Sequence, residues 1–247
     1  MLFDTPPPLR VETSPPVPLF HKASAFPGRR RVMAAPVLLE SSFVHDLGAA
    51  AVTTAVFLLV LQFWEELAKR GVFEQKLGRK LVHISAGLVF MLCWPLFSSG
   101  TRAPFLAAFA PGINIFRMLL LGHGISKNEA TVKSMSRYGD HRELLKGPLY
   151  YACTITFSTA IFWRTSPIAV AAICNLCAGD ALRISWQALY MHYFHTFGFI
   201  EESWRMVMGF LVASLAAAFV ESLPISTELD DNLTVTVASM LVGGLVF

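Results

Sequence analysis

Long apolar runs, separated by short polar connections, follow one another from about residue 46 to the end of the chain. A helix needs ~20 largely apolar residues to cross the hydrocarbon core of a bilayer. Membrane-spanning helices are therefore predicted at 46–64, 82–99, 103–121, 148–164, 166–182, 205–222 and 233–247. The pattern predicts an all-α fold, a polytopic integral membrane protein with about 6–7 transmembrane helices.

Residues 184–199 are a weaker extra candidate, because His192 and His195 interrupt the apolar run. The aromatic residues of this stretch could instead lie at the membrane–water interface, where Tyr and Trp gather. These residues are Tyr190, Tyr193, Phe194 and Phe197.

The composition agrees with a membrane protein. The chain is 54% hydrophobic and 15% charged, whereas soluble domains carry about 25% charged residues. The net charge of +3 is small and scattered, which argues against nucleic acid as a partner. The four cysteines lie in apolar runs and predict no disulfide framework, and the lone Cys-x-x-Cys at 174–177 lacks the second pair that a zinc site needs.

Residues 1–45 differ from the rest of the chain because they are rich in proline, basic and poor in acidic residues. This composition is typical of an organelle transit peptide, with cleavage near 31–35, and lacks the apolar core of a secretory signal. The alternative is a disordered cytosolic tail. The sequence thus predicts a leader at 1–45 and a transmembrane domain at 46–247.

Basic residues cluster in two connections that alternation of the predicted spans places on the same side of the membrane. These are Lys69, Arg70, Lys76, Arg79 and Lys80 in the first, and Lys127, Lys133, Arg137, Arg142 and Lys146 in the second. The positive-inside rule assigns that side to the cytoplasm or stroma.

Four polar clusters stand at the ends of the predicted spans, at 76–87, 137–151, 175–180 and 221–232. The first two are basic, and Lys and Arg at such positions either bind phosphates or simply fix topology. The second runs into Gly147 and Pro148 at a predicted helix start, which is a ready anion site beside Lys146. The last two are acidic, and Asp180 inside an apolar segment is costly without a cation such as Mg²⁺. The structural alternative for each cluster is a solvated loop or helix end.

Basic groups for phosphates, acids for Mg²⁺ and a lipid-facing location together favour phosphoryl transfer to an acceptor dissolved in the bilayer. The clusters also resemble a known family. The segments Lys-Leu-x-Arg-Lys-x-x-His at 76–83, Arg-x-x-Asp-x-x-Glu-Leu-Leu-Lys-Gly-Pro-Leu-Tyr-Tyr at 137–151, Asn-Leu-Cys-Ala-Gly-Asp at 175–180 and Glu-Ser-Leu-Pro-Ile-Ser-x-x-Leu-Asp-Asp-Asn at 221–232 are similar to those of plant phytol and farnesol kinases. The segment at 197–204 is closer to the phytol branch, and the resemblance covers about 45–247.

The resemblance implies a plastid membrane protein that transfers a phosphoryl group from CTP, or another nucleoside triphosphate, to phytol for tocopherol synthesis. Farnesol or geranylgeraniol are the alternative prenol acceptors. For such a kinase we expect Mg²⁺ to be held by Asp180, Glu221, Asp230 and Asp231. Phosphate binding would fall to Arg79, Lys80, Lys146, Asn175 and Gly179. Asp180 and His83 are the expected catalytic residues, with His83 or a carboxylate taking the alcohol proton.

The chain departs from the family pattern directly after Asp180. The family continues there with Gly-x-Ala-Asp-x-x-Gly-Arg and Lys-Ser-x-Ala-Gly-Ser, whereas this chain reads Ala-Leu-Arg-Ile-Ser-Trp at 181–186 and resumes the pattern near Tyr193. An internal deletion is therefore expected. It leaves open a non-enzymatic prenol-binding or scaffold protein, and more remotely a transporter, although the repeats typical of transporters are not visible.

Overall fold

The computed structural model describes residues 31–177, 179–223 and 230–247, with side chains described from residue 42 onward except those of 179–181. Contacts divide the chain into two units, Met1–Val37 and Leu38–Phe247. Helix α1 (Arg31–Arg70) begins in the first unit, inside the segment predicted as a leader. The predicted division at residues 45 and 46 stays a prediction, and all other elements belong to the second unit.

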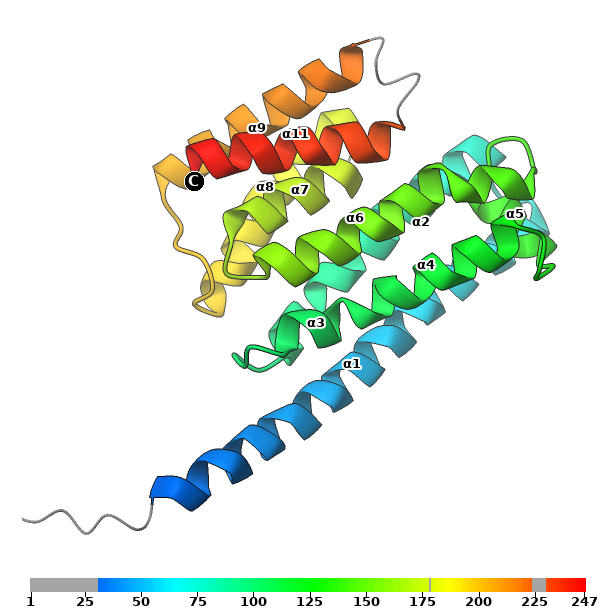
Figure 1. The fold of residues 1–247 in the computed structure, drawn as a ribbon. Coiled ribbons are helices and arrows are strands. Elements are labelled where there is room, and N and C mark those ends of the chain that lie inside the picture. Colours follow the sequence, from blue (N-terminus) through cyan, green and yellow to red (C-terminus); the bar gives the residue numbers. More distant parts are fainter. Residues whose placement is uncertain (1–30, 178, 224–229) are drawn as a thin grey trace, which may run out of the picture. The chain divides into compact units, whose positions relative to one another are not determined.

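The second unit is built from helices (Figure 1). The described residues contain no strand, which confirms the predicted all-α fold. After α1 the chain forms α2 (Gln75–Leu92), η1 (Trp94–Leu96), α3 (Ala103–Ala107), α4 (Phe109–Gly122), α5 (Glu129–Met135), η2 (His141–Leu145), α6 (Gly147–Phe162), α7 (Pro167–Cys177), α8 (Gly179–Thr196), α9 (Trp204–Ser222) and α11 (Asp231–Val246).

Long apolar helices support the assignment to the membrane. In the described part of the chain, four segments are long and apolar enough to cross a bilayer: Ser42–Arg70, Gln75–Leu96, Ala103–Gly122 and Trp204–Ser222. The helices α7 and α11 are apolar but shorter. Every predicted span overlaps a helix, while the number of 6–7 crossings stays a prediction.

Helix α7 is the centre of the unit's core. It packs against α2, α6, α8, α9 and α11, and its residues from Ala169 to Cys174 have no exposed surface. Small side chains such as Ala169, Ala171 and Ala172 let neighbouring backbones approach closely, which is how helices associate where lipid removes the hydrophobic driving force. Because these helices pack around α7, their ends, which carry the polar clusters, are held in set positions.

Most of the weak extra candidate at 184–199 belongs to helix α8, and two of its four aromatic residues lie in the core rather than at an interface. Tyr190 and Phe194 are buried. The hydroxyl of Tyr190 donates to the carbonyl of Leu88 at 2.5 Å, and the ring of Phe194 stacks on that of Trp94 with centroids 5.6 Å apart. The belt interpretation is wrong for these two residues because α8 turns this face toward the core.

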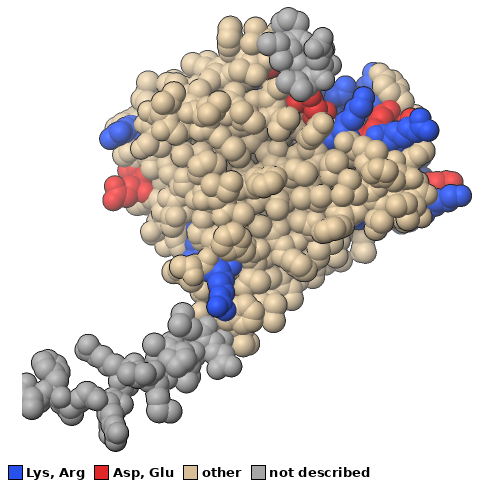
Figure 2. All heavy atoms as spheres, in the orientation of Figure 1, with Lys and Arg blue, Asp and Glu red and all other residues tan. Residues whose placement is uncertain are grey.

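The two basic connections meet at one end of the unit. Gln75 Nε2 at the start of α2 donates to Ser136 Oγ after α5 at 3.1 Å, which joins the two basic connections. Figure 2 shows charged side chains gathered at the upper right of the visible face, beyond a broad uncharged surface. This arrangement agrees with the predicted common side of the basic connections.

Candidate functional site

A cavity of about 490 Å³ opens at this charged end, and all four predicted polar clusters contribute to its wall. Its walls come from six places: the start of α2, the segment after α5, the end of α7, the first turns of α8, the end of α9 and the start of α11. The lining residues are Lys76, Arg79, Lys80, His83, Ile84, Arg137, Tyr138, Asn175, Leu176, Cys177, Arg183, Glu221, Asp230, Asp231, Asn232 and Val235.

The basic wall of the cavity belongs to α2. Residues three and four apart lie on one face of a helix, so Lys76, Arg79, Lys80 and His83 form a single stripe. Arg79 is half-buried, and its Nε has no hydrogen-bond partner within the described part of the chain. A guanidinium held in this position can bind an anion that enters the cavity.

His83 lies at the inner end of the stripe in a fixed orientation. Its Nδ1 is 2.8 Å from the carbonyl oxygen of Arg79, which can only accept, so Nδ1 carries the proton and Nε2 of the neutral ring is left as an acceptor. The ring packs edge-on against Tyr151, with centroids 4.4 Å apart. The geometry therefore suits the predicted role of His83 as a general base.

The acidic wall is the start of α11. The carboxylate of Asp230 caps this helix by accepting from the Asn232 amide N–H at 3.0 Å, and the Asn232 side chain donates to the carbonyl of Gly147 at 3.1 Å. A β-carbon on Gly147 would lie 3.3 Å from Asp230 Oδ2 and 3.6 Å from Arg79 Nη1. The start of α6 thus brings the acidic and basic walls together.

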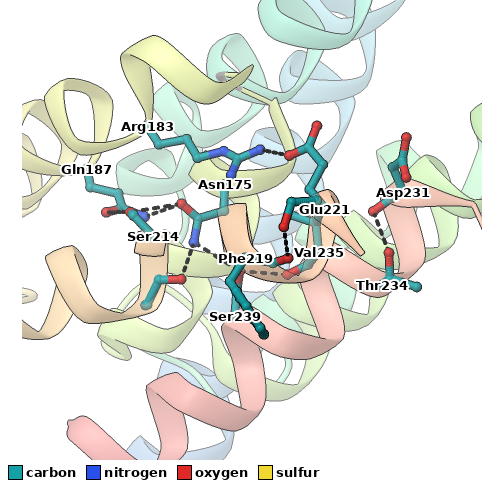
Figure 3. A network of polar contacts seen from close by, with 12 residues as sticks. Asn175, Arg183, Gln187, Ser214, Phe219, Glu221, Asp231, Thr234, Val235 and Ser239 are labelled. Atoms are coloured by element: carbon teal, nitrogen blue, oxygen red, sulfur yellow. Dashed lines mark hydrogen bonds and ion pairs between the residues drawn. The ribbon is translucent and has the colours of Figure 1, made fainter. Parts of the chain in front are cut away.

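Glu221 at the end of α9 forms an ion pair with Arg183 of α8 (Figure 3). The Arg183 side chain is buried, while that of Glu221 is about one-third exposed. Glu221, predicted as a metal ligand, therefore already has a cationic partner. Breaking such a pair leaves an uncompensated buried charge, so the pair holds α8 against α9.

Asn175 is the centre of a buried polar network that joins α7, α8, α9 and α11 (Figure 3). Its Nδ2 donates to Ser239 Oγ at 2.9 Å and to the Ala213 carbonyl at 3.4 Å. Its Oδ1 accepts from Gln187 Nε2 at 2.8 Å. Ser214 Oγ lies 3.1 Å from that Oδ1 and 2.9 Å from Gln187 Oε1, and donates its single proton to one of the two. These bonds use the capacity of the amide, so the structure favours a packing role over the predicted phosphate contact.

Alanine at Asn175 is expected to destabilise the chain by about 2–4 kcal/mol, because the buried Gln187 and Ser239 would each lose a bond at about 1–3 kcal/mol. Thermal unfolding of the purified chain in detergent micelles measures the loss. Ser222→Ala is the matched control, since Ser222 is exposed and, among the described residues, its hydroxyl donates within its own helix turn to the Phe219 carbonyl. An Asn175→Ala chain as stable as the control would contradict the packing role.

The remaining predicted residues are placed differently. Lys146 precedes α6 and is not among the residues that line the cavity. Gly179 and Asp180 begin α8, but the Asp180 side chain lies outside the described part of the structure. Among the described residues, no three His, Cys, Asp or Glu side chains are arranged to hold a metal ion by themselves. Asp230 and Asp231 do line the cavity, and Mg²⁺ commonly uses one or two carboxylates together with substrate phosphates.

The structure also adds residues that the sequence did not single out as site residues. Arg137 and Tyr138 lie within the second quoted cluster, and Asn232 ends the fourth, so their motifs carried a signal. Arg183 had no such signal, because it lies in the stretch that departs from the family pattern.

Comparisons with known proteins identify close relatives. The chain is 62% identical to the "Probable phytol kinase 2, chloroplastic" of Oryza sativa subsp. japonica, over 89% of this chain and 82% of that protein. It is 48% identical to the "Farnesol kinase, chloroplastic" of Arabidopsis thaliana, over 97% and 87% of the two chains. It is 37% identical to the "Phytol kinase 1, chloroplastic" of the same plant, over 88% and 82%. No family model and no solved structure matches.

The alignments contain an internal length difference. The alignment to the rice protein has 250 positions, whereas 89% of this 247-residue chain is about 220 residues. The alignment to the farnesol kinase has 272 positions, whereas 97% of this chain is about 240 residues. Both relatives therefore have about 30 residues, within the aligned region, that have no counterpart here. The length difference agrees with the deletion expected from the sequence.

Proposed function

This chain belongs to the family of phytol and farnesol kinases, and from that membership we propose that it phosphorylates the hydroxyl of a long prenol at the expense of a nucleoside triphosphate. The observation that carries the proposal is the cavity, where five cationic side chains and three carboxylates gather at the end of an apolar helical unit. Such a site suits a polyphosphate donor from water and an alcohol from the bilayer.

The basic wall is proposed to hold the donor. Arg79 offers a planar fork for phosphate oxygens, and Lys80 a point charge beside it. Asp230 and Asp231 on the opposite wall would hold Mg²⁺ together with the phosphates. The ion, when bound, neutralises phosphate charge.

His83 is proposed as the base for the acceptor. The prenol oxygen forms a new bond to the terminal phosphorus, the bond from that phosphorus to the bridging oxygen breaks, and the nucleoside diphosphate leaves with the electron pair. The hydroxyl proton passes to Nε2 of His83, which its Nδ1 bond to the Arg79 carbonyl leaves available. Ile84, Leu176 and Val235 also line the cavity, and their apolar side chains would contact the hydrocarbon of the prenol next to its hydroxyl group.

CTP is proposed as the donor and phytol as the first acceptor, which would supply tocopherol synthesis. Farnesol is the close alternative, because the chain is more similar to the Arabidopsis farnesol kinase than to the phytol kinase 1 of that plant. The description of the relatives as chloroplastic and the apolar helices of this chain together support a plastid membrane as the location.

Label transfer in membranes tests the proposal. Membranes that contain the full chain receive each of the four common nucleoside triphosphates, labelled on the terminal phosphate, with phytol or farnesol and Mg²⁺. The expected result is a labelled prenyl phosphate in the lipid phase, formed fastest from CTP. The absence of product with every donor and acceptor, from protein shown to be folded, would contradict the proposal.

A second candidate function is a prenol-binding membrane protein without kinase activity. It is favoured by the absence of about 30 residues that the relatives contain. The insertion of the rice protein's extra residues distinguishes the two candidates. If the original chain is inactive and the restored chain forms prenyl phosphate, the deletion has removed catalysis while leaving the fold.

A further inference from the structure

Tyr138 is an aromatic residue at the mouth of the cavity with its side chain in water. It lies between α5 and η2, lines the cavity together with Lys76 and Arg137, and is 79% exposed. Most other large exposed apolar side chains lie on the apolar helices, where lipid would cover them. The neighbours of Tyr138 in the chain, from Arg137 to Arg142, are polar or charged or are glycine, so the ring lies in a hydrophilic segment.

The backbone on both sides of Tyr138 is fixed. The buried Ser136 accepts from Gln75 Nε2 at 3.1 Å and from the Gly139 amide at 3.0 Å. The Arg137 amide donates to the carboxylate of Glu143. Gly139 has φ +84°, a conformation that glycine adopts without strain. The turn therefore presents the ring at a set position, and a ligand that binds it would lose little loop entropy.

The chemistry of the cavity changes from its rim inward. Its basic stripe is suited to phosphates, while Tyr138 has a flat π-face that can stack on a planar ring. A nucleotide has the same two parts, a charged polyphosphate and a planar base. We propose that Tyr138 stacks on the base of the donor nucleotide while its phosphates occupy the stripe of Lys76, Arg79 and Lys80. This inference rests on the proposed function for the identity of the ligand.

Stacking on a single aromatic ring discriminates little between the four bases, because every base has a π-face. Tyr138 thus contributes affinity for CTP, ATP, GTP and UTP alike. The alternative role for an exposed Tyr is an anchor at the membrane–water interface, which predicts no effect on nucleotide binding.

Equilibrium binding without acceptor tests this inference independently of turnover. The purified full chain in detergent micelles is titrated with CTP and, separately, with inorganic tripolyphosphate, which has the charges but no base. Tyr138→Ala is expected to weaken CTP binding about tenfold, the equivalent of roughly 1.4 kcal/mol of lost stacking, and to leave tripolyphosphate binding unchanged. Tyr138→Phe keeps the ring and should bind CTP as the unaltered chain does.

Trp204→Ala is the matched control. Trp204 is an equally exposed aromatic residue, at 85%, but it begins α9 at the end away from Glu221 and the cavity. Equal CTP affinity in Tyr138→Ala and the unaltered chain would overturn the inference. So would an unaltered chain that binds CTP no better than tripolyphosphate. A Tyr138-dependent gain for CTP in a chain that phosphorylates no prenol would support the inference and contradict the proposed function.

Discussion

Alanine at Gly87 is expected to destabilise the chain by about 1–3 kcal/mol or more, the range for overpacking a tight core. Gly87 is buried on α2 where that helix meets α7. A β-carbon there would lie inside contact distance of Cys177 Sγ and 2.6 Å from the hydroxyl oxygen of Tyr151. That hydroxyl itself donates to the His83 carbonyl at 2.5 Å, so it has little freedom to move away.

Thermal unfolding in micelles measures this effect. The Tm is expected to fall by about 2–4 °C for each kcal/mol of lost stability in a chain of this size. Gly78→Ala is the matched control on the same helix, because a β-carbon there meets nothing within 4 Å. The control should be neutral or slightly stabilising, as alanine favours a helix over glycine. A Gly87→Ala chain that melts with the control would show that α2 and α7 do not approach this closely.

Alanine at Arg79 is expected to lower phosphoryl transfer by about 100-fold or more, equivalent to ~2.7 kcal/mol, since a charge-assisted phosphate contact would be lost. Arg79 belongs to the basic stripe and is half-buried, and its Nε has no partner within the described residues. Arg79→Lys keeps the charge but not the fork, so a smaller loss is expected. Rates of labelled prenyl phosphate formation at saturating prenol measure both variants.

Arg102→Ala is the charge-matched control for this prediction. Arg102 precedes α3, is exposed and does not line the cavity. Both variants should melt at the temperature of the unaltered chain, so that a lost rate reports chemistry rather than unfolding. Equal activity in Arg79→Ala and Arg102→Ala would remove Arg79 from the donor site.

The apolar runs predicted helical structure at every proposed span, because that pattern follows from local sequence. They did not predict α5, the start of α1 before residue 46, or the division of the span at 166–182 between α7 and α8. The sequence placed the polar clusters at the ends of spans but did not show which of them meet. In the structure Arg79, His83 and Asp230 line the same cavity. The network of Asn175 could not be predicted. Its partner Ser239 lies 64 residues away in the chain, so only the packing of α7 against α11 reveals it.

Residues near the departure from the family pattern were the least predictable. Arg183 belongs to the stretch that follows the departure, yet it reaches the cavity wall and pairs with Glu221. The buried Tyr190 was equally hidden from the sequence, because the same aromatic pattern fits a membrane interface or a helix core. In both cases the tertiary contact, rather than the local pattern, determines the role.

The most direct test is label transfer by the purified chain itself. The full chain in detergent micelles receives CTP labelled on its terminal phosphate, Mg²⁺ and phytol or farnesol, and prenyl phosphate is identified by its mass and its label. We expect a product that requires both the chain and the prenol and that forms about 100-fold more slowly, or not at all, with Arg79→Ala. No product from a folded chain that binds both substrates, under conditions where a relative carrying the extra residues is active, would contradict the proposed function.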